Sequence, residues 1–403
     1  MKSNLGHLDI TGCLTFEVIF LIYFDNAATS GKKPISVSRA MAFSVENYSA
    51  NPGRSGHDLS VKTADKVYKT REKISNFFGS CGAETVVFTQ NCTHSINCVL
   101  KGVLRRGDHV IVSDFEHNAV MRPLNKMGVS YSVAKSGDTT AKTLENFKRN
   151  IKPNTRLVLV SGASNVTGEV LPISQIGLIC KKKNIRFCVD AAQIGGILPI
   201  DMQKMNIDYL CLAPHKGLYA PMGIGVLICR KPIENTLIEG GTGTDSVNFL
   251  QPTTLPEGLE SGTINVPAIF GLSAGVDFVK NKGIETIYKH EFSLLSYLYD
   301  ELLKNEKIVL YTKPPKFNYT VPVLPFNYKG LKSFETAQIL NKYGFAVRAG
   351  YHCAPTAHKK MGTMSYGAVR VSFGAFNNRY EVTKFVNLLK DENFIKNYKK
   401  VVE

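Results

Sequence analysis

Short apolar runs that alternate with helical patterns constrain the fold of this 403-residue chain more than any other feature. Most of these runs are rich in β-branched residues, end at a polar or glycine-containing turn, and lead into residues with helical spacing. Strands that are apolar along their whole length are typical of a sheet covered on both faces, and such sheets are mostly parallel. The sequence therefore predicts an α/β fold. The expected strands are 85–89, 109–113, 156–161, 187–189, 209–212 and 225–229.

Polar side chains follow five of these strands, at the point where each strand ends. Ligands bind beyond the carboxyl ends of the strands in open α/β sheets, so we expect these side chains to share one site. They include Thr93, His94, His117, Asn165, Asp190, Gln193, His215 and Lys216.

The pattern changes at about residue 266. Two longer helical patterns come first and shorter strands follow, which predicts a second, α+β domain. The helices are expected over 268–280 and 284–305, and the strands near 321–326 and 369–373.

The chain therefore divides into three expected parts. The first twenty residues lack a basic region that leads directly into an apolar run, so no signal peptide is expected. We interpret them as an extension, with a short strand as the alternative, and no apolar run reaches membrane-spanning length. The parts are an N-terminal extension over 1–20, a large domain over 21–265 and a small C-terminal domain over 266–403.

The chain is basic, with 49 Lys and Arg against 33 Asp and Glu and a net charge of +16. The basic residues are dispersed, and the densest runs, 181–183 and 399–400, are short. We interpret the charge as a solvated basic surface, which is compatible with an enzyme that binds a small anion. Binding to nucleic acid, to an acidic protein or to an anionic membrane face stays open as an alternative.

The nine cysteines favour a reducing compartment such as the cytoplasm, because they are odd in number and contain no C-x-x-C pair. No metal is predicted, since His352, Cys353 and His358 have no second cysteine at zinc-site spacing. The phosphate-loop and dinucleotide glycine motifs are also missing from the sequence, which weakens a nucleotide-binding interpretation.

Three positions suggest chemistry, and each also has a structural interpretation. Thr93 lies where a strand leads into a helix, which is a natural phosphate site, although Thr93 or Ser95 would also serve as an N-cap. Asp190 would suit a cationic ring nitrogen or cap a helix beginning near residue 191. Lys216 follows a buried strand. There it would be partly desolvated, which favours the neutral, nucleophilic form of the amine, or it would be an ordinary surface lysine.

Two positions of the C-terminal part suggest further chemistry. Cys353 lies in a glycine-containing segment beside His352 and near Arg348, a setting typical of reactive thiols, although most cysteines are small buried residues. Arg370 lies in a strand-like run, where it would be a half-exposed ladder residue or present a fork to a carboxylate.

Taken together, seven segments resemble the class V aminotransferase family and, within it, the cysteine desulfurases. They keep the family order and span roughly residues 22 to 390. The compact loop around Cys353 is similar to that of the group II enzymes, which are selenocysteine lyase-like. The segments are 23–29, 51–57, 190–193, 215–217, 261–263, 348–353 and 369–372.

The resemblance implies pyridoxal phosphate in a fold type I homodimer, with a mostly parallel mixed sheet in the large domain and a smaller α+β domain. Lys216 would hold the cofactor as a Schiff base, Asp190 would pair with the ring nitrogen, and His117 would stack on the ring. The other cofactor contacts would come from Thr93, Asn165, Gln193 and His215, and from Gly262 and Thr263 of the other subunit.

The resemblance also implies the conversion of L-cysteine, or of L-selenocysteine, to L-alanine. Lys216, Cys353 and His117 would be catalytic, and Cys353 would take the sulfur as a persulfide and pass it to a thiol or protein acceptor. The substrate carboxylate would bind Arg370, with Arg348, Asn165 and Arg54 beside the substrate.

Two departures from the family pattern are Cys92, where a threonine is common, and Ala213, where a serine is common. Each change removes a hydroxyl expected at the phosphate, so we expect weaker cofactor retention, since a neutral hydrogen bond is worth about 1 kcal/mol. A selenocysteine lyase, a C–S lyase and a transaminase stay open as alternatives on the same fold. A basic nucleic-acid-binding or scaffold protein is the non-enzymatic alternative.

Overall fold

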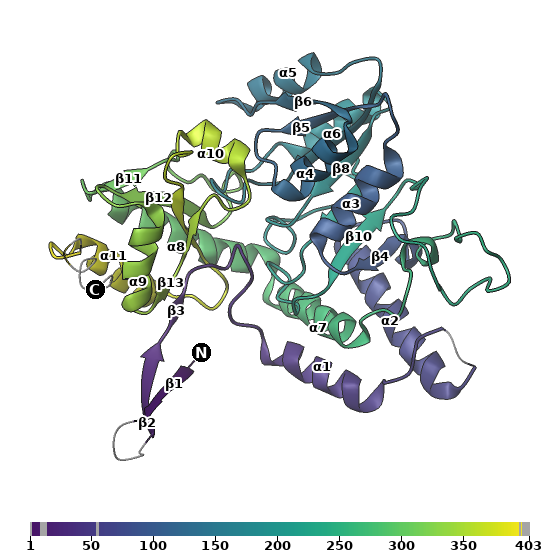
Figure 1. Ribbon diagram of the computed structural model, residues 1–403, viewed down its shortest axis with the longest axis horizontal. Helices are drawn as coiled ribbons and strands as arrows, with labels where there is room; N and C mark the ends of the chain where they lie inside the picture. Colours follow the sequence, from purple (N-terminus) through teal and green to yellow (C-terminus); the bar gives the residue numbers. More distant parts are fainter. Residues whose placement is uncertain (1, 9–13, 54–55, 395, 397–403) are drawn as a thin grey trace.

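The computed structural model describes residues 2–8, 14–53, 56–394 and 396 of the chain. Two bodies of secondary structure lie side by side (Figure 1), a larger one around a seven-stranded sheet and a smaller one that contains α9 and β12. The predicted α/β fold with a mostly parallel, mixed sheet is confirmed.

The large sheet has the strand order β4-β10-β9-β8-β7-β5-β6. All neighbouring pairs are parallel except those of β10, which is antiparallel to both β4 and β9. The strands are β4 (Val86–Thr89), β5 (His109–Ser113), β6 (Ser130–Ala134), β7 (Thr155–Ser161), β8 (Arg186–Asp190), β9 (Tyr209–Leu212) and β10 (Gly225–Cys229).

Alternate residues of each central strand pack on opposite faces of this sheet, as the pleat requires. In β7, Val158 and Val160 join one apolar cluster, whereas Leu157 and Leu159 join another. The first face packs against α2, α5, α6 and α7, and the second against α3 and α4. These helices are α2 (Asp58–Phe77), α3 (Cys92–Val103), α4 (Asn118–Met127), α5 (Thr140–Arg149), α6 (Ile173–Lys182) and α7 (Val266–Lys282), and α1 (Ile35–Asn47) packs on α7.

The smaller body is built on an antiparallel sheet of order β11-β12-β15-β14. Its apolar core includes residues of α8, α9 and α11. The elements are α8 (Ile284–Leu303), β11 (Ile308–Leu310), β12 (Val323–Tyr328), α9 (Ser333–Lys342), β13 (Phe345–Ala346), β14 (Arg348–Gly350), α10 (Pro355–Met361), β15 (Ala368–Ser372) and α11 (Arg379–Lys390).

The first of the seven family-like segments, residues 23–29, joins this smaller body. Strand β3 (Ile22–Tyr23) pairs in parallel with β13, and Asp25 forms a bridge with Ser372. The buried Phe24 ring meets the Phe373 ring edge-on, with centroids 5.2 Å apart. Residues from the two ends of the chain therefore share one core.

Residues 1–20 were interpreted as an extension, with a short strand as the alternative. Strands β1 (Lys2–Leu8) and β2 (Leu14–Phe20) pair as an antiparallel hairpin, so the strand alternative holds for this segment. Over the part of the chain that the structure describes, no helix combines the length and the apolarity needed to cross a membrane.

Candidate functional site

A cavity of about 590 Å³, open solvent included, lies at the carboxyl ends of the parallel strands. The sequence predicted that polar residues after these strands would come together, and the cavity brings together all of the named ones except His94, which is not part of its lining. Its lining includes Cys92, Thr93, His117, Asn165, Asp190, Gln193, Ala213, His215 and Lys216.

Lys216 is held in a turn after β9, where its backbone N–H donates to the carbonyl of Ala213. Burial lowers the pKa of the Lys216 ammonium, and the positive charges of Arg370 and Arg348 act in the same direction, whereas Asp190 opposes the shift. The predicted desolvation is therefore confirmed. A neutral amine in this position is a nucleophile.

The peptide bond before Lys216 is fixed by an unusual number of donors. The carbonyl of His215 accepts from the Lys33 ammonium at 2.7 Å, and from the Ser30 N–H, the Ser30 hydroxyl and the Thr29 hydroxyl at 3.0–3.1 Å. Burial lowers the pKa of Lys33 to about 8. This arrangement restricts the backbone from which the Lys216 side chain extends.

Asp190 ends β8 and presents one carboxylate oxygen to the protein. Its Oδ1 accepts from the Ala192 N–H at 2.9 Å and from the Cys92 thiol at 3.5 Å. The expectation of a helix beginning near residue 191 was wrong, because turns follow β8 and Asp190 caps one of them. Burial raises the pKa of Cys92 well above its usual value, so Cys92 stays a protonated donor to Asp190.

The N-terminus of α3 forms one wall of the cavity. Asn91 is its N-cap, and its side chain accepts from the His94 N–H, so the prediction that Thr93 or Ser95 caps this helix was wrong. Thr93 is thus free for another role. Across the cavity, the buried His215 Nδ1 has no hydrogen-bond partner among the described residues, and burial lowers the pKa of His215 to about 4.

His117 lines another side of the cavity, and the residue before it, Glu116, joins two strand ends. The His117 Nδ1 accepts from the Ala119 N–H at 3.0 Å as the N-cap of α4, and burial lowers the pKa of His117. The buried Glu116 carboxylate accepts from Ser113 and Ser161, which joins the ends of β5 and β7. Burial raises the pKa of Glu116 to about 7.

The loop that carries Cys353 is tied to this cavity at two points. The Cys353 carbonyl accepts from the Asn118 N–H at 2.8 Å, and the Asn165 side chain donates to the His352 carbonyl at 2.8 Å. His352 and Cys353 both have left-handed backbones, with φ of 51° and 56°. Such conformations are uncommon outside glycine, and the Cys353 thiol in this loop is exposed.

Two arginines approach the site from neighbouring strands. Arg370 and Arg348 face each other in the β14–β15 pair. The Arg370 guanidinium is buried, pairs with Asp25 at 2.6 Å and donates to the Asn165 carbonyl at 3.0 Å. Its Nε atom is buried without a partner among the described residues, so the guanidinium retains capacity to bind an anion.

Two predicted residues, Gly262 and Thr263, lie outside this cavity. Gly262 lines a separate cavity that also contains Arg71 and Glu260, and Thr263 is exposed beside it. Arg54 lies outside the described residues. The remaining candidate, Gln193, lines the Lys216 cavity and donates to the Ala27 carbonyl at 3.1 Å.

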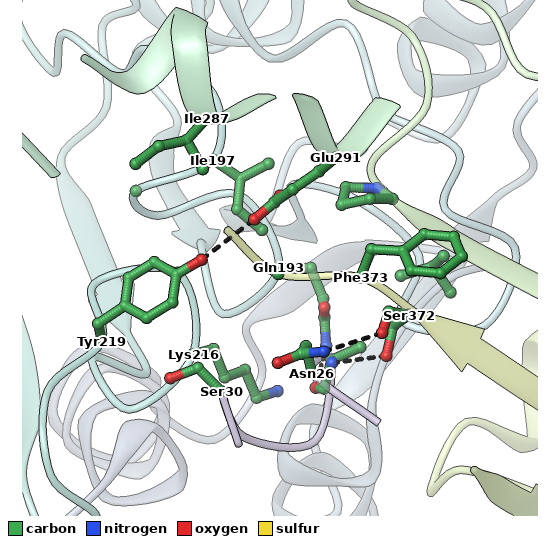
Figure 2. A pocket seen from close by; sticks show the side chains of 16 residues that line it. Asn26, Ser30, Gln193, Ile197, Lys216, Tyr219, Ile287, Glu291, Ser372 and Phe373 are labelled. Atoms are coloured by element: carbon green, nitrogen blue, oxygen red, sulfur yellow. Dashed lines mark hydrogen bonds between the residues drawn. The ribbon is translucent and has the colours of Figure 1, made fainter. Parts of the chain in front are cut away.

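A second cavity of about 410 Å³ lies on the other side of Lys216, which lines both spaces. Figure 2 shows Glu291 in this cavity, with the hydroxyl of Tyr219 directed to its carboxyl group. Tyr219 donates to Glu291 Oε1 at 3.1 Å and accepts from the Ala375 N–H. Glu291 Oε2 is buried without a partner among the described residues, and burial raises the Glu291 pKa to about 8.

The raised pKa of Glu291 makes the free energy of unfolding depend on pH. Between pH 4.5 and about 8, the folded protein keeps a proton on Glu291 that the unfolded chain has released. Its contribution to the free energy of unfolding therefore falls as the pH rises through this window. The Glu291→Gln variant lacks this titration, so its thermal midpoint relative to wild type should rise from about pH 5 to about pH 8 by several degrees.

The matched control is Glu285→Gln, an exposed position on the same helix. Its midpoint relative to wild type should stay constant over the same interval, because the Lys289 ammonium lowers the pKa of Glu285 in the folded protein. A parallel pH response of the Glu291→Gln variant and wild type would contradict a protonated Glu291.

Sequence reasoning assigned no role to Asp25, Glu116 or Lys33. Glu116 carried a usable signal, since it follows a buried strand next to His117. Asp25 and Lys33 carried no such signal in the sequence, because their partners Arg370 and His215 are 345 and 182 positions away.

Among the described residues, no group of three or more metal-ligating side chains is present.

Comparisons with known proteins agree with this geometry. Residues 22–385 match the family described as Aminotransferase class-V. A cysteine desulfurase of Haloferax volcanii is 30% identical, with 92% of this chain and 88% of that protein covered. The apo structure of a cysteine desulfurase from Thermococcus onnurineus has a TM-score of 0.84 at 30% identity, covering 94% of this chain and 95% of that one. A cysteine desulfurase structure from Escherichia coli has a TM-score of 0.81 at 26% identity, with 94% and 95% covered.

Proposed function

The chain belongs to the class V aminotransferase family, and on that premise we propose that it is a pyridoxal-phosphate-dependent cysteine desulfurase. It would convert L-cysteine to L-alanine and hold the sulfur on Cys353 before delivery to an acceptor. One observation carries the proposal: the Cys353 loop is bonded to Asn118 and Asn165, the segments that also bring His117 and Asn165 to Lys216.

The residues around Lys216 fit the cofactor. The unpartnered His215 Nδ1 and the N-terminus of α3, with the free Thr93 hydroxyl, suit a phosphate group. Asp190 has one oxygen occupied by Ala192 and Cys92, which leaves the other for a protonated ring nitrogen. His117, Asn165 and Gln193 complete the proposed cofactor contacts.

The Cys92 side chain changes the expectation for cofactor retention. Its thiol donates to Asp190 and not toward the phosphate site. In this proposal Cys92 supports the carboxylate that pairs with the ring, and only the Ala213 position lacks a hydroxyl for phosphate. Cofactor retention then depends mainly on Lys216, His215 and the α3 N-terminus.

Pyridoxal phosphate, when bound, withdraws electrons from the α-carbon of an attached amino acid and so makes its bonds easier to break. Lys216 would hold the cofactor covalently until substrate arrives. Its lowered pKa then lets the freed amine accept the α-proton at neutral pH. Lys216 would next deliver a proton, so that the β-carbon–sulfur bond becomes the bond to break.

Cys353 would complete the reaction as a nucleophile. Its thiolate attacks the substrate sulfur, a sulfur–sulfur bond forms, and the carbon–sulfur bond breaks with its electron pair passing to the carbon side. Cys353 becomes a persulfide, and protonation of the carbon product gives alanine. No external oxidant is required, because the substrate carbon is reduced as the sulfur is oxidised.

The substrate carboxylate would bind Arg370, with Arg348 beside it. Replacing Arg370 by lysine keeps a positive charge for Asp25 but removes the fork that a carboxylate needs. We expect KM for L-cysteine to rise about 10- to 100-fold, the range that hydrogen bonds to charged groups supply. Steady-state kinetics on cofactor-loaded protein measure this change.

The lysine variant should retain the visible absorbance of the bound cofactor. Arg379→Lys, a change at an exposed arginine that begins α11, is the matched control and should leave KM unchanged. An unchanged KM in the Arg370→Lys variant would remove Arg370 from substrate binding.

The proposal includes three features of the whole molecule. The chain would act as a homodimer in the cytoplasm, with Gly262 and Thr263 of one subunit at the cofactor phosphate of the other. The exposed position of both residues, outside their own Lys216 cavity, supports this placement. The division into a large domain over 21–265 and a small one over 266–403 is part of the proposal.

Product identification tests the proposed activity most directly. Cofactor-loaded protein incubated with L-cysteine and a reducing thiol should release alanine and sulfide in equal amounts. Pyruvate in place of alanine would indicate a C–S lyase, and keto-acid-dependent amino transfer would indicate a transaminase.

A further inference from the structure

A chain of hydrogen-bonded side chains starts at His352, the residue before Cys353. The His352 Nδ1 lies 3.1 Å from the His358 Nε2, and the His358 Nδ1 lies 2.7 Å from the Thr363 hydroxyl oxygen. The two imidazole rings are stacked, with centroids 5.4 Å apart and an interplanar angle of 13°. All three residues are buried. We call His352, His358 and Thr363 the buried histidine chain.

Burial keeps both imidazole rings of the buried histidine chain uncharged at neutral pH. It lowers the pKa of His352 to about 2, and the positive charge of Arg370 acts in the same direction. Burial also lowers the pKa of His358. A neutral imidazole has one nitrogen that donates and one that accepts. The direction of each hydrogen bond between these rings is therefore fixed once a single proton is located.

The contact between Thr363 and His358 locates that proton. A distance of 2.7 Å is typical of a hydroxyl donor, whereas N–H donors usually lie about 2.9–3.0 Å from their acceptors. The His358 carbonyl, a second acceptor for this hydroxyl, lies farther away at 3.5 Å. We therefore assign the hydroxyl as the donor to His358 Nδ1. The His358 proton is then on Nε2 and is donated to His352 Nδ1, and His352 carries its own proton on Nε2.

The orientation of the His352 ring depends on its hydrogen bond with His358. The His352 Nε2 is buried without a hydrogen-bond partner among the described residues, so Nδ1 is the nitrogen that fixes the ring. The His358 ring that supplies this bond is itself held in place. The Tyr351 ring meets it edge-on at 5.5 Å, and its helix, α10, joins an apolar cluster with Val166.

The His352 ring bears on Cys353 because both residues have left-handed backbones, with φ of 51° and 56°. Such conformations persist where the surroundings hold them. The backbone of this turn is tied by the Asn165 side chain at the His352 carbonyl and by the Asn118 N–H at the Cys353 carbonyl, both at 2.8 Å. The His352 ring adds a tie through a side chain. Without it, the turn would be freer to adopt a more common conformation.

We propose that His358 is a positioning residue for Cys353: by donating from Nε2 to His352 Nδ1, it holds the turn that presents the thiol to the substrate sulfur. This inference rests on the proposed function, because the thiol needs a fixed position only if it attacks the substrate. Misplacing a reacting group by about 1 Å can lower a rate about 100-fold. His358 is not part of the lining of the Lys216 cavity, so the proton transfers at the α-carbon should not depend on it.

Three variants of cofactor-loaded protein separate this hydrogen bond from the packing of the ring. The His358→Gln variant places an amide nitrogen where the imidazole Nε2 lies, so it can still donate to His352. In the shorter His358→Asn variant the amide reaches only the position of Nδ1, next to Thr363. The His358→Phe variant keeps the ring and its contact with Tyr351 but has no donor. We expect kcat for alanine formation to fall about 100-fold in the His358→Asn and His358→Phe variants and to stay close to wild type in the His358→Gln variant, with KM for L-cysteine unchanged in all three.

A partial reaction shows whether the rest of the site is intact in these variants. In deuterium oxide, cofactor-loaded protein should exchange the α-proton of L-alanine for deuterium, a step that needs Lys216 but no thiol. This exchange should run at the wild-type rate in the three His358 variants and in the Cys353→Ala variant. Loss of exchange in parallel with kcat in the His358→Asn and His358→Phe variants would indicate general damage to the fold and would overturn the positioning role.

Neutron diffraction from crystals of the cofactor-loaded wild-type protein tests the direction of the buried histidine chain without any substitution. We expect deuterium on the Nε2 atoms of His358 and His352, and on the Thr363 hydroxyl with its bond directed to His358 Nδ1. Deuterium on His352 Nδ1 would reverse the donation and overturn the proposal.

Failure of this inference and failure of the proposed function are distinguishable. Wild-type protein that neither forms alanine from L-cysteine nor exchanges the α-proton of L-alanine would contradict the proposed function itself. With an active wild-type protein, an unchanged kcat in the His358→Phe variant, or equal losses in the His358→Gln and His358→Asn variants, would overturn the positioning role of His358 alone.

Discussion

Replacing Cys353 with alanine should stop the formation of alanine from L-cysteine while leaving the bound cofactor in place. The thiol is exposed and belongs to a loop that contacts the cavity through its backbone, so its loss should not disturb Lys216 or His117. We expect turnover to fall by at least about a thousandfold, because loss of the nucleophile removes the covalent route for sulfur. Alanine quantification and the visible spectrum measure the two effects.

Cys81→Ala is the matched control, since Cys81 is also exposed but lies in the turn before η1 (Ala83–Thr85), away from the cavity lining. It should retain full activity. Wild-type turnover in the Cys353→Ala variant would remove the thiol from the mechanism. Activity of the Cys353→Ala variant on L-selenocysteine but not on L-cysteine would instead indicate that selenium, the better leaving group, departs without attack by a nucleophile.

Replacing Lys216 with alanine should remove both the covalent attachment of the cofactor and the proton transfers at the α-carbon. The loss of a positioned acid–base group alone costs about 100- to 10,000-fold in rate. In wild-type protein, borohydride treatment followed by mass spectrometry should find the cofactor on Lys216. The variant should bind the cofactor without any such adduct.

Lys33 provides a demanding control for this assignment. Burial also lowers the pKa of Lys33, to about 8, and its ammonium donates to the carbonyl of the residue before Lys216. An adduct on Lys33 in wild-type protein, or an unchanged adduct after Lys216→Ala, would contradict the assignment of Lys216. An adduct confined to Lys216 would show that cavity position, and not a lowered pKa alone, selects the reactive amine.

The sequence predicted the parts of the fold that depend on local pattern. The apolar runs became strands because alternate residues such as Val158 and Leu159 are buried on opposite faces, and both faces need apolar side chains. The grouping of Asp190 and Lys216 followed from parallel strands, whose carboxyl ends meet at one edge.

The errors concern details that local pattern does not determine. Asn91, Thr93 and Ser95 are all good N-cap residues, and the helix begins after the one whose backbone is extended. The turn after Asp190 forms because the Ala191 N–H bonds to the Cys211 carbonyl of the neighbouring strand. Such long-range contacts are absent from the pattern of any single segment.

Buried acids were the largest omission at the site. Glu116 and Glu291 are ordinary charged residues in the sequence, and helix α8 has the spacing of a helix with one polar face. Their burial appears only when β5 meets β7 and when α8 covers Tyr219. Their burial, which raises the pKa of Glu116 to about 7 and that of Glu291 to about 8, is therefore not visible in the pattern of any single segment.

The pairing of β3 with β13 and the ion pair of Asp25 with Arg370 join residues that are synthesised early to residues that are synthesised late. Asp25 emerges from the ribosome long before Arg370, its partner, and Ile22 waits for Phe345 to complete their strand pair. A nascent or C-terminally truncated chain that has already formed the central sheet would thus lack the Arg370 guanidinium and the Cys353 thiol. Arg370 and the Cys353 loop can therefore join the Lys216 cavity only after most of the printed sequence has been synthesised.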